Sequence, residues 1–331
     1  MKVRQLSTVH DVGDTRVTHK ECASLVAAGY DTALISSVPD DVIYAGVPVL
    51  GIGRPRNRLD RMTAHQVRML RRALAEDADV YHFHDPELIP VGLLLKARGK
   101  RVVYDVHEDV PKQIMNKFWI HPWAKAPFAA AARGFEGLAG RFLDGIVTAT
   151  PSIALKFPAA KTVVVQNFPE ASLAAEQNTT PFADRGNAFV YGGGLSVQQG
   201  LFEMLQAFTR LPDGVTGVLA GKFKQTEAEA RAHPGWAHVR YPGVVDRDRV
   251  VAELRDSVVG LVLDHPITNY VDAYSTKMFE YMACGLPVIC SDFPLWVDIV
   301  AETGCGVAVD PFDTDAVASG KVRVVQVAEQ G

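Results

Sequence analysis

The chain has 331 residues, of which 48% are hydrophobic and 22% charged, and its formal net charge is −4. This length suits two domains, and the composition is that of an ordinary soluble protein, which excludes a disordered or fibrous chain. There is no run of about 18 apolar residues, and no signal peptide precedes the first predicted strand, so we expect a cytoplasmic protein. The four cysteines lack metal-ligand spacing and are interpreted as reduced core residues.

Charge is distributed unevenly along the chain. Residues 1–166 carry 22 basic and 17 acidic side chains, whereas residues 167–331 carry 12 basic and 21 acidic ones. Many of the basic side chains are arginines between Arg54 and Arg72. Such a surface is either a solvated basic face or one that attracts an anionic membrane or a phosphate-bearing acceptor. Nucleic acid is not an expected partner, because no aromatic-studded sheet or helix-turn-helix pattern accompanies the arginines.

In the first half of the chain, short apolar runs alternate with amphipathic segments, which is typical of a parallel sheet covered by helices. The predicted strands are 3–9, 31–36, 80–84, 101–106, 145–149 and 162–166. The predicted helices are 18–28, 62–76, 87–97 and 125–143. Residues 1–168 are therefore interpreted as one α/β domain with a doubly wound, Rossmann-like sheet.

The pattern breaks at residues 169–187, which are polar, lack a clear period and are interpreted as a linker. A second alternating series then begins at residue 188 and is interpreted as a second Rossmann-like domain, 188–331. Its predicted strands are 188–192, 217–220, 238–241, 258–263, 287–290 and 306–309. We expect the carboxyl ends of the two parallel sheets to face each other across a ligand cleft.

Polar residues follow the strands of the first domain. His10 and Arg16 come after strand 3–9, where a Rossmann-like domain presents backbone N–H groups to phosphate. Gly13 stands alone there, so the Gly-x-Gly-x-x-Gly fingerprint is missing and no nicotinamide cofactor is expected. His84 and Asp85 follow strand 80–84, with Asp85 also placed to cap the next helix.

Residues 112–128 interleave aromatic side chains with cations, which fits either a loop that contacts a membrane or acceptor lipid, or ordinary packing between domains.

In the second domain, Gly192, Gly193 and Gly194 connect a strand to a helix. A glycine loop at this place lets the backbone come close to a pyrophosphate. Lys222 lies in the loop after the next strand, 217–220.

The stretch 269–290 predicts a loop, a short helix and a buried strand. Ser275 or Thr276 is placed to cap the helix, and Gly285 is placed to end it in the left-handed conformation. Lys277 in the first turn adds a positive charge to the anion site at the helix start. Asp272 and Glu280, with seven residues between them, flank that site, an arrangement that suits a sugar nucleotide.

These residues carry a resemblance to a known family. The spacing of Asp272 and Glu280, followed by Met-Ala-Cys-Gly-Leu-Pro-Val-Ile, resembles the paired-acid signature of the family 4 retaining glycosyltransferases. The motif His-Asp-Pro-Glu-Leu at 84–88, and Asp-x-Arg at 14–16 followed by Lys-Glu, resemble a bacterial polysaccharide-biosynthesis subfamily. The resemblance implies the GT-B fold, a nucleoside diphosphate sugar as donor, most simply a UDP-sugar, and a saccharide or lipid-linked acceptor. It implies no cofactor and no metal.

The resemblance also implies roles for single residues. Glu280 would hold the ribose hydroxyls, Asp272 and His107 the donor sugar, and Lys277 the diphosphate. The further residues implied at the donor are Gly192, Gly193, Gly194, Lys222, Ser275 and Thr276, and those implied on the acceptor side are His10, Arg16, His84 and Asp85.

The chain departs from the family pattern in two places. Gly194 and Gln199 stand where many members carry an arginine and a lysine that face the diphosphate. The segment after residue 315 lacks the usual C-terminal crossover helix, and we expect it to be truncated or altered. These departures leave two alternatives open, namely a GT-B nucleotide-sugar epimerase and a degenerate partner of an active transferase.

Overall fold

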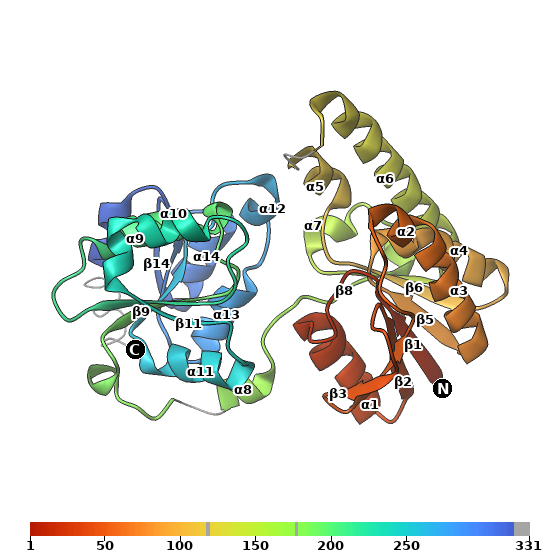
Figure 1. Ribbon diagram of the computed structural model, residues 1–331, viewed down its shortest axis with the longest axis horizontal. Helices are drawn as coiled ribbons and strands as arrows, with labels where there is room; N and C mark the ends of the chain where they lie inside the picture. Colours follow the sequence, from red (N-terminus) through yellow and green to blue (C-terminus); the bar gives the residue numbers. More distant parts are fainter. Residues whose placement is uncertain (117–119, 176–177, 321–331) are drawn as a thin grey trace. The chain divides into compact units, whose positions relative to one another are not determined.

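A computed structural model describes residues 1–116, 120–175 and 178–320. The chain divides into two compact units, Met1–Asn167 and Phe168–Gly331, called unit 1 and unit 2 below (Figure 1). Within the described ranges, no helix combines the length and the apolar character that crossing a membrane requires. Residues 117–119 of the aromatic and cationic segment, 176–177 of the predicted linker and 321–331 lie outside the described residues.

Unit 1 is built on an eight-stranded sheet with the order β3-β4-β2-β1-β5-β6-β7-β8. The strands are β1 (Lys2–Leu6), β2 (Asp31–Ser36), β3 (Val42–Tyr44), β4 (Val47–Gly51), β5 (Val80–Phe83), β6 (Arg101–Val106), β7 (Gly145–Thr148) and β8 (Thr162–Val164). All neighbours are parallel apart from β3 and β4. This edge hairpin was not predicted from the sequence, and its two-residue turn places Ala45 and Gly46 at positive φ.

The helical segments of unit 1 cover both faces of this sheet (Figure 1). They are the π-helix η1 (Thr15–Cys22), α1 (Ala23–Ala27), α2 (Arg58–Met62), α3 (Ala64–Glu76), η2 (Pro86–Leu88), α4 (Ile89–Ala97), α5 (Val110–Asn116), α6 (Pro122–Phe142), α7 (Pro151–Ala154) and η3 (Ala159–Lys161). The predicted helix 18–28 is thus a π-helix continued by a short α-helix, and π-turns are rare and concentrated at functional sites.

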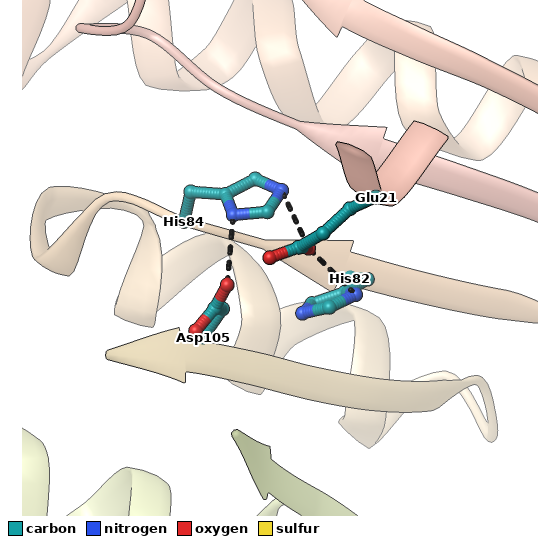
Figure 2. A group of neighbouring side chains, drawn as sticks. All are labelled: Glu21, His82, His84 and Asp105. Atoms are coloured by element: carbon teal, nitrogen blue, oxygen red, sulfur yellow. Dashed lines mark ion pairs between the residues drawn. The ribbon is translucent and has the colours of Figure 1, made fainter. Parts of the chain in front are cut away.

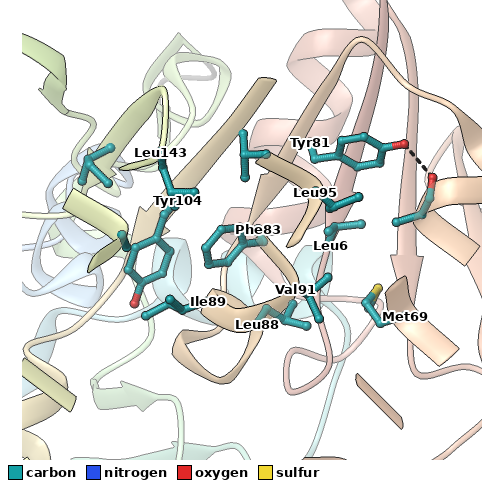
Figure 3. Packing of buried hydrophobic residues seen from close by; sticks show 14 of the residues in the cluster. Leu6, Met69, Tyr81, Phe83, Leu88, Ile89, Val91, Leu95, Tyr104 and Leu143 are labelled. Carbon is teal, nitrogen blue, oxygen red and sulfur yellow. Dashed lines mark hydrogen bonds between the residues drawn. The ribbon is translucent and has the colours of Figure 1, made fainter. Parts of the chain in front are cut away.

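The two faces of the unit 1 sheet differ in character. Leu6, Phe83 and Tyr104 share one row of the strand register and belong to the main apolar core, where Phe83 and Tyr104 stack at 4.7 Å (Figure 3). The neighbouring row contains Gln5 paired with His82, so these polar side chains point to the opposite face. Strands of parallel sheets are ordinarily apolar on both faces. On β2 and β4 this row continues with the apolar Leu34 and Val49. The buried polar part of the face, across β1, β5 and β6, therefore marks the place in unit 1 where function is to be sought.

Unit 2 has a six-stranded parallel sheet with the order β11-β10-β9-β12-β13-β14. The strands are β9 (Ala188–Gly192), β10 (Thr216–Ala220), β11 (Val239–Gly243), β12 (Val259–Val262), β13 (Val288–Ser291) and β14 (Gly306–Val309). The helical segments are α8 (Ala171–Ala175), η4 (Phe182–Asp184), η5 (Val197–Gln199), α9 (Leu201–Phe208), α10 (Glu227–Ala232), η6 (Pro234–His238), α11 (Arg247–Asp256), α12 (Thr268–Val271), α13 (Thr276–Ala283) and α14 (Pro294–Thr303). All six predicted strands are present, with bounds within two residues of those expected.

Both faces of the unit 2 sheet are apolar. One core gathers around Phe189, Tyr191 and α9, and the other around Val190, Tyr281 and α13. Gly260 on β12 packs against the second core, and a Cβ added to this glycine would lie 2.3 Å from the Tyr281 ring. The Tyr281 hydroxyl in turn accepts a hydrogen bond from the N–H of Gly192 at 3.0 Å. The missing side chain at 260 thus lets Tyr281 hold the start of the glycine loop.

We expect Gly260→Ala to destabilise unit 2 by about 1–3 kcal/mol, because the added methyl group overpacks a closed core. Hydrogen exchange of the β9 and β12 amides, followed by mass spectrometry, measures this change. Gly134→Ala is the matched control, because a Cβ there meets nothing within 4 Å and lies in helix α6. That variant should be neutral or more stable, and unchanged exchange in Gly260→Ala would contradict the packing argument.

Candidate active site

Each sheet reverses its strand order once. In unit 1 the reversal lies between β1 and β5, and in unit 2 it lies between β9 and β12. Loops that leave two such strands diverge to opposite faces, and the crevice between them is where open α/β sheets bind ligands. The residues at these points are Ser7–His10 and His84–Asp85 in unit 1, and Gly193–Ser196 and Leu263–His265 in unit 2.

A row of hydrogen-bonded side chains crosses the polar face of unit 1. Gln5 Nε2 lies 3.2 Å from His82 Nδ1, and Gln5 Oε1 lies 2.7 Å from His84 Nε2. His84 Nδ1 lies 3.1 Å from His107 Nε2, which is also 3.1 Å from Asp105 Oδ2. The side chain of His107 is 17% exposed, so the row ends at the protein surface.

The chemistry of the row decides where the ring protons lie. Gln5 Oε1 can only accept a hydrogen bond, so His84 Nε2 donates and Nδ1 of that ring accepts. Burial lowers the pKa of His84, which keeps the ring neutral. His107 Nε2 then donates toward His84 and the Asp105 carboxylate. Nδ1 of His107 has no hydrogen-bond partner among the described residues and is the ring atom available to a ligand.

Glu21, His82, His84 and Asp105 are a donor set of the kind that holds a divalent metal, since their ligand atoms lie within 4.8 Å of one another (Figure 2). However, the Arg16 guanidinium already contacts both carboxylates. Its Nη2 lies 2.9 Å from Asp105 Oδ1 and its Nε lies 3.0 Å from Glu21 Oε1. A metal ion would have to displace this cation and break the hydrogen bonds of the imidazoles. The geometry therefore favours an arginine-centred cluster over a metal site.

The acidic and histidine side chains of this buried cluster have strongly shifted pKa values. Burial and the neighbouring Asp105 raise the pKa of Glu21 to about 9. Arg16 Nε donates to Asp105 Oδ2 at 3.1 Å, so the Glu21 oxygens receive no hydrogen bond from the described residues despite the short ion-pair distance. Burial opposes ionisation of Asp105, but the hydrogen bond from His107 Nε2 holds its pKa well below the usual value. Burial lowers the pKa of His82 to about 3.

The four predicted acceptor-side residues differ in how deeply they are buried. His10 is partly exposed, with its ring 4.8 Å from that of His107. A hydrogen bond to Asp14 at 3.0 Å raises the pKa of His10. The other three, Arg16, His84 and Asp85, are buried. Asp85 was expected to line a cleft, but its Oδ2 accepts from the backbone N–H of Thr8 at 2.5 Å and fixes the loop after β1.

In unit 2, Lys277 reaches from the first turn of α13 to the glycine loop. Its Nζ lies 3.3 Å from the Tyr191 hydroxyl and 3.7 Å from Asp264 Oδ1. The Gln199 amide, in the orientation that satisfies its neighbours, accepts from this Nζ at 3.1 Å. Tyr191 donates to the Gly194 carbonyl at 2.9 Å. The ammonium group of Lys277 thus lies where the carboxyl ends of β9 and β12 and the start of α13 come together.

The glycine loop uses most of its N–H groups within the protein. Gly192 donates to Tyr281, and Gly193 donates to the Ala220 carbonyl at 2.9 Å. The N–H groups of Gly192 and Gly193 are therefore not available to a phosphate, and the close approach of the backbone expected at these two glycines stays a prediction. In the described part of the chain, the N–H of Gly194 has no partner and is the donor left for a ligand.

Helix α13 begins and ends where the sequence indicated. Ser275 is the N-cap residue, but its hydroxyl makes no capping hydrogen bond, which differs from the expectation. Gly285 has φ +62° and follows the helix as predicted. Glu280 lies one turn after Lys277, with Oε1 3.4 Å from Arg247 Nη1, and Asp272 directly follows α12.

The models of two known protein families together match nearly all of the chain. Residues 13–167 match the model of the glycosyl transferase 4-like domain, and residues 174–325 match that of the glycosyl transferases group 1. The chain is a glycosyltransferase of the GT-B type. The comparison with curated proteins found no matching sequence.

Solved structures confirm the GT-B fold of this glycosyltransferase. Sucrose-phosphate synthase from Thermosynechococcus elongatus has a TM-score of 0.72 at 17% identity, covering 99% of this chain and 90% of that one. HepE of Anabaena, in complex with UDP and glucose, has a TM-score of 0.71 at 15% identity, covering 100% and 91%. The UDP-forming trehalose-phosphate synthase of Burkholderia xenovorans, in complex with glucose-6-phosphate, has a TM-score of 0.65 at 14% identity, covering 98% and 92%.

Several residues of the glycosyltransferase's polar clusters were not singled out from the sequence. In unit 1 they are Gln5, His82 and Asp105, and in unit 2 they are Tyr191, Lys224 and Asp264. Asp14 and Glu21 of the unit 1 cluster were quoted from the sequence only as members of the Asp-x-Arg and Lys-Glu motifs. One signal was available for the first group, because a polar residue at alternate positions of an otherwise apolar parallel strand is unusual. The second group is joined by contacts between separate loops and carries no local signal.

The raised pKa of Glu21 predicts a pH-dependent stability. Below pH 4.5 the folded and unfolded forms are equally protonated, and between pH 4.5 and 9 the folded form alone keeps the proton. The contribution of Glu21 to stability is therefore lost as the pH rises through about 9. We expect Glu21→Gln to remove a slope of up to about 1.4 kcal/mol per pH unit, so that the variant is more stable than the wild type at pH 8 to 9.

Thermal unfolding between pH 5 and pH 9 measures this difference. Asp11→Asn is the control, because Asp11 is exposed and its removal should leave the slope unchanged. Parallel pH profiles for the wild type and Glu21→Gln would show that Glu21 is ionised in the folded protein.

Proposed function

We propose that the protein is a retaining glycosyltransferase that moves a sugar from a UDP-sugar to a saccharide or lipid-linked acceptor in the cytoplasm. The assembly of a surface polysaccharide or glycoconjugate is the proposed setting, and its support is the His-Asp-Pro-Glu-Leu resemblance at 84–88. The observation that carries the donor assignment is the position of Lys277. Its ammonium group lies at the start of a helix, beside a glycine loop, where a parallel sheet reverses its order.

In this proposal each donor group has its own partners. The diphosphate is held by Lys277, by the free N–H of Gly194 and by the polar residues Ser275 and Thr276 at the start of α13. Glu280 accepts hydrogen bonds from the ribose hydroxyls, since it lies one turn further along the same helix. UDP as the nucleotide is supported by two of the similar structures, because HepE is in complex with UDP and the trehalose-phosphate synthase is UDP-forming.

The donor sugar is assigned to Asp272 and to Nδ1 of His107, the ring atom that the unit 1 network leaves unused. In the proposed reaction the bond from the anomeric carbon to the phosphate oxygen breaks, and the acceptor oxygen bonds on the same face. The departing phosphate takes the acceptor proton, so no protein base is required. Lysine and helix-end charges stabilise the leaving diphosphate. This proposal needs no metal ion and no cofactor, consistent with Arg16 in contact with both carboxylates of the metal-like cluster.

A lipid-linked acceptor would bring the protein to a membrane surface, and helix α6 supports this part of the proposal. Trp123 and Phe128 are 75% and 55% exposed, and Phe135 and Phe142 continue the exposed aromatic series. Arg133 and Arg141 on the same helix are exposed cations. Aromatic rings together with cations are typical of surfaces that lie at an anionic lipid interface. The arginines of 54–72 are weaker support, because three of them pair with Glu87, Asp60 and Asp41.

Lys277→Ala and Glu280→Ala should each weaken UDP binding by about tenfold or more, because each removes a charge-assisted hydrogen bond. Isothermal titration calorimetry with UDP measures the affinity. Glu302→Ala on α14 is the control for loss of an exposed carboxylate. Unchanged UDP affinity in both site variants would remove the donor assignment.

Turnover separates the transferase from its two alternatives. UDP release from a UDP-sugar that depends on added acceptor supports the transferase, whereas interconversion of UDP-sugars without acceptor supports an epimerase. The degenerate-partner alternative has a specific observation in its favour, namely the uncharged residues Gly194 and Gln199. It predicts that UDP does not bind at all.

We expect the protein to sediment with phosphatidylglycerol vesicles and less with phosphatidylcholine vesicles, because exposed cations favour the anionic surface. Trp123→Ser combined with Phe128→Ser should reduce the bound fraction severalfold. Leu155→Ser serves as the control, since Leu155 is an exposed apolar residue of unit 1 outside α6. Equal binding by all three proteins would argue against a membrane contact through α6.

A further inference from the structure

A diphosphate bound at the glycine loop needs positive charge around it. Gly194 and Gln199 are both uncharged, so the glycine loop itself brings no cation. Lys277 contributes one positive charge, but the buried Asp264 carboxylate lies 3.7 Å from it. A pyrophosphate diester carries two negative charges. A second cation is therefore needed at the loop if a nucleoside diphosphate is to bind tightly.

The structure brings a second lysine to this loop. A Cβ built on Gly194 would lie 2.8 Å from Lys224 Cε and 3.5 Å from Lys224 Nζ. These two atoms, with Gln199 Oε1 at 3.3 Å, are the three nearest to that position. The Lys224 side chain thus extends across the face of Gly194, in the space that a side chain at 194 would need. Lys222, the lysine expected from the sequence, contributes none of these atoms.

Backbone contacts hold Lys224 in this place. Leu195 and Phe223 form an isolated parallel β-bridge. The N–H of Leu195 donates to the Lys222 carbonyl at 2.9 Å, and the N–H of Lys224 donates to the Leu195 carbonyl at 2.9 Å. The loop after β10 is therefore tied to the glycine loop on both sides of the bridge. The Lys224 side chain itself is exposed.

A buried acid indicates that the lysines act together. The Asp264 side chain is 7% exposed, and its Oδ1 has no hydrogen-bond partner among the described residues. Burial raises its pKa, while the charges of Lys277 and Lys224 both act to lower it. Both ammonium groups are thus within electrostatic range of one carboxylate. Beside them lies the unpaired N–H of Gly194, a donor without a partner in the described chain.

We propose that Lys224 is a donor-binding residue of this glycosyltransferase, whose ammonium group contacts the diphosphate beside Gly194 and supplies the cation that the glycine loop lacks. The inference rests on the proposed function, because it presupposes a nucleoside diphosphate at this loop. Gly194 then has a steric role, since any side chain there would displace Lys224. Lys277 and Lys224 approach the diphosphate from α13 and from the loop after β10, with the Gly194 N–H between them.

Calorimetry with three probes tests the proposal. Lys224→Ala should weaken the binding of UDP by about tenfold to a hundredfold, weaken UMP less, and leave uridine unchanged, because the lost contact is to phosphate. Arg210→Ala is the charge-matched control. Arg210 follows α9, which leads from the carboxyl end of β9 to the amino end of β10, so it lies at the opposite edge of the sheet. This variant should bind UDP as the wild type does.

A rescue variant makes the test sharper. Gly194→Arg in the Lys224→Ala protein should restore most of the UDP affinity, because the cation returns to the same place from the other loop. Gly194→Arg alone should give no gain, since its side chain meets Lys224. Wild-type UDP affinity in Lys224→Ala would overturn the proposal, as would a loss confined to Lys222→Ala. A wild-type protein that binds none of UDP, GDP and ADP would overturn the proposed function together with this inference.

Discussion

Parallel strand pairing is the constraint on which the rest of this structure depends. Because parallel strands end at the same edge of a sheet, every loop that leaves a carboxyl end is delivered to one side of its unit. In unit 1 this gathers the residues after β1, β5 and β6, and in unit 2 those after β9, β10 and β12. Residues far apart in sequence, such as Arg16 and Asp105, thereby become neighbours without any local motif.

The two units use this edge differently. Unit 2 is apolar on both faces of its sheet, and the groups around Lys277 come from loops, from the start of α13 and from the Tyr191 hydroxyl at the end of β9. Unit 1 carries Gln5, His82 and Asp105 on the strands themselves, beneath η1. A buried ion pair such as Arg16–Asp105 adds little net stability, since desolvation offsets the attraction. Its evident effect is on geometry, because Asp105 and His84 both contact Nε2 of His107 and leave Nδ1 of that ring without a partner among the described residues.

Strand periodicity made most of the fold predictable, because buried parallel strands are short apolar runs that stand out from amphipathic helices. The hairpin of β3 and β4 was missed since Val42–Tyr44 is exposed and gives no burial signal. For the site, His107 directly follows β6 and the glycine loop follows β9, as the strand pattern indicated. This pattern did not indicate that Asp85 is buried or that the N–H groups of Gly192 and Gly193 are already paired. Those outcomes depend on which neighbouring strand or loop supplies a partner, and this pairing is decided by tertiary structure.

The same limit explains why residue-by-residue comparison with a family pattern is misleading at the glycine loop. Position 194 lacks a cation, but the space around Gly194 contains one, because the bridge between Leu195 and Phe223 brings Lys224 across the loop. At Gln199 the amide faces the ammonium group of Lys277 in the same way. A binding site for an anion requires positive charge at a certain position in space, and that charge can come from any segment of the chain. Two uncharged residues in the loop therefore do not by themselves indicate a degenerate site.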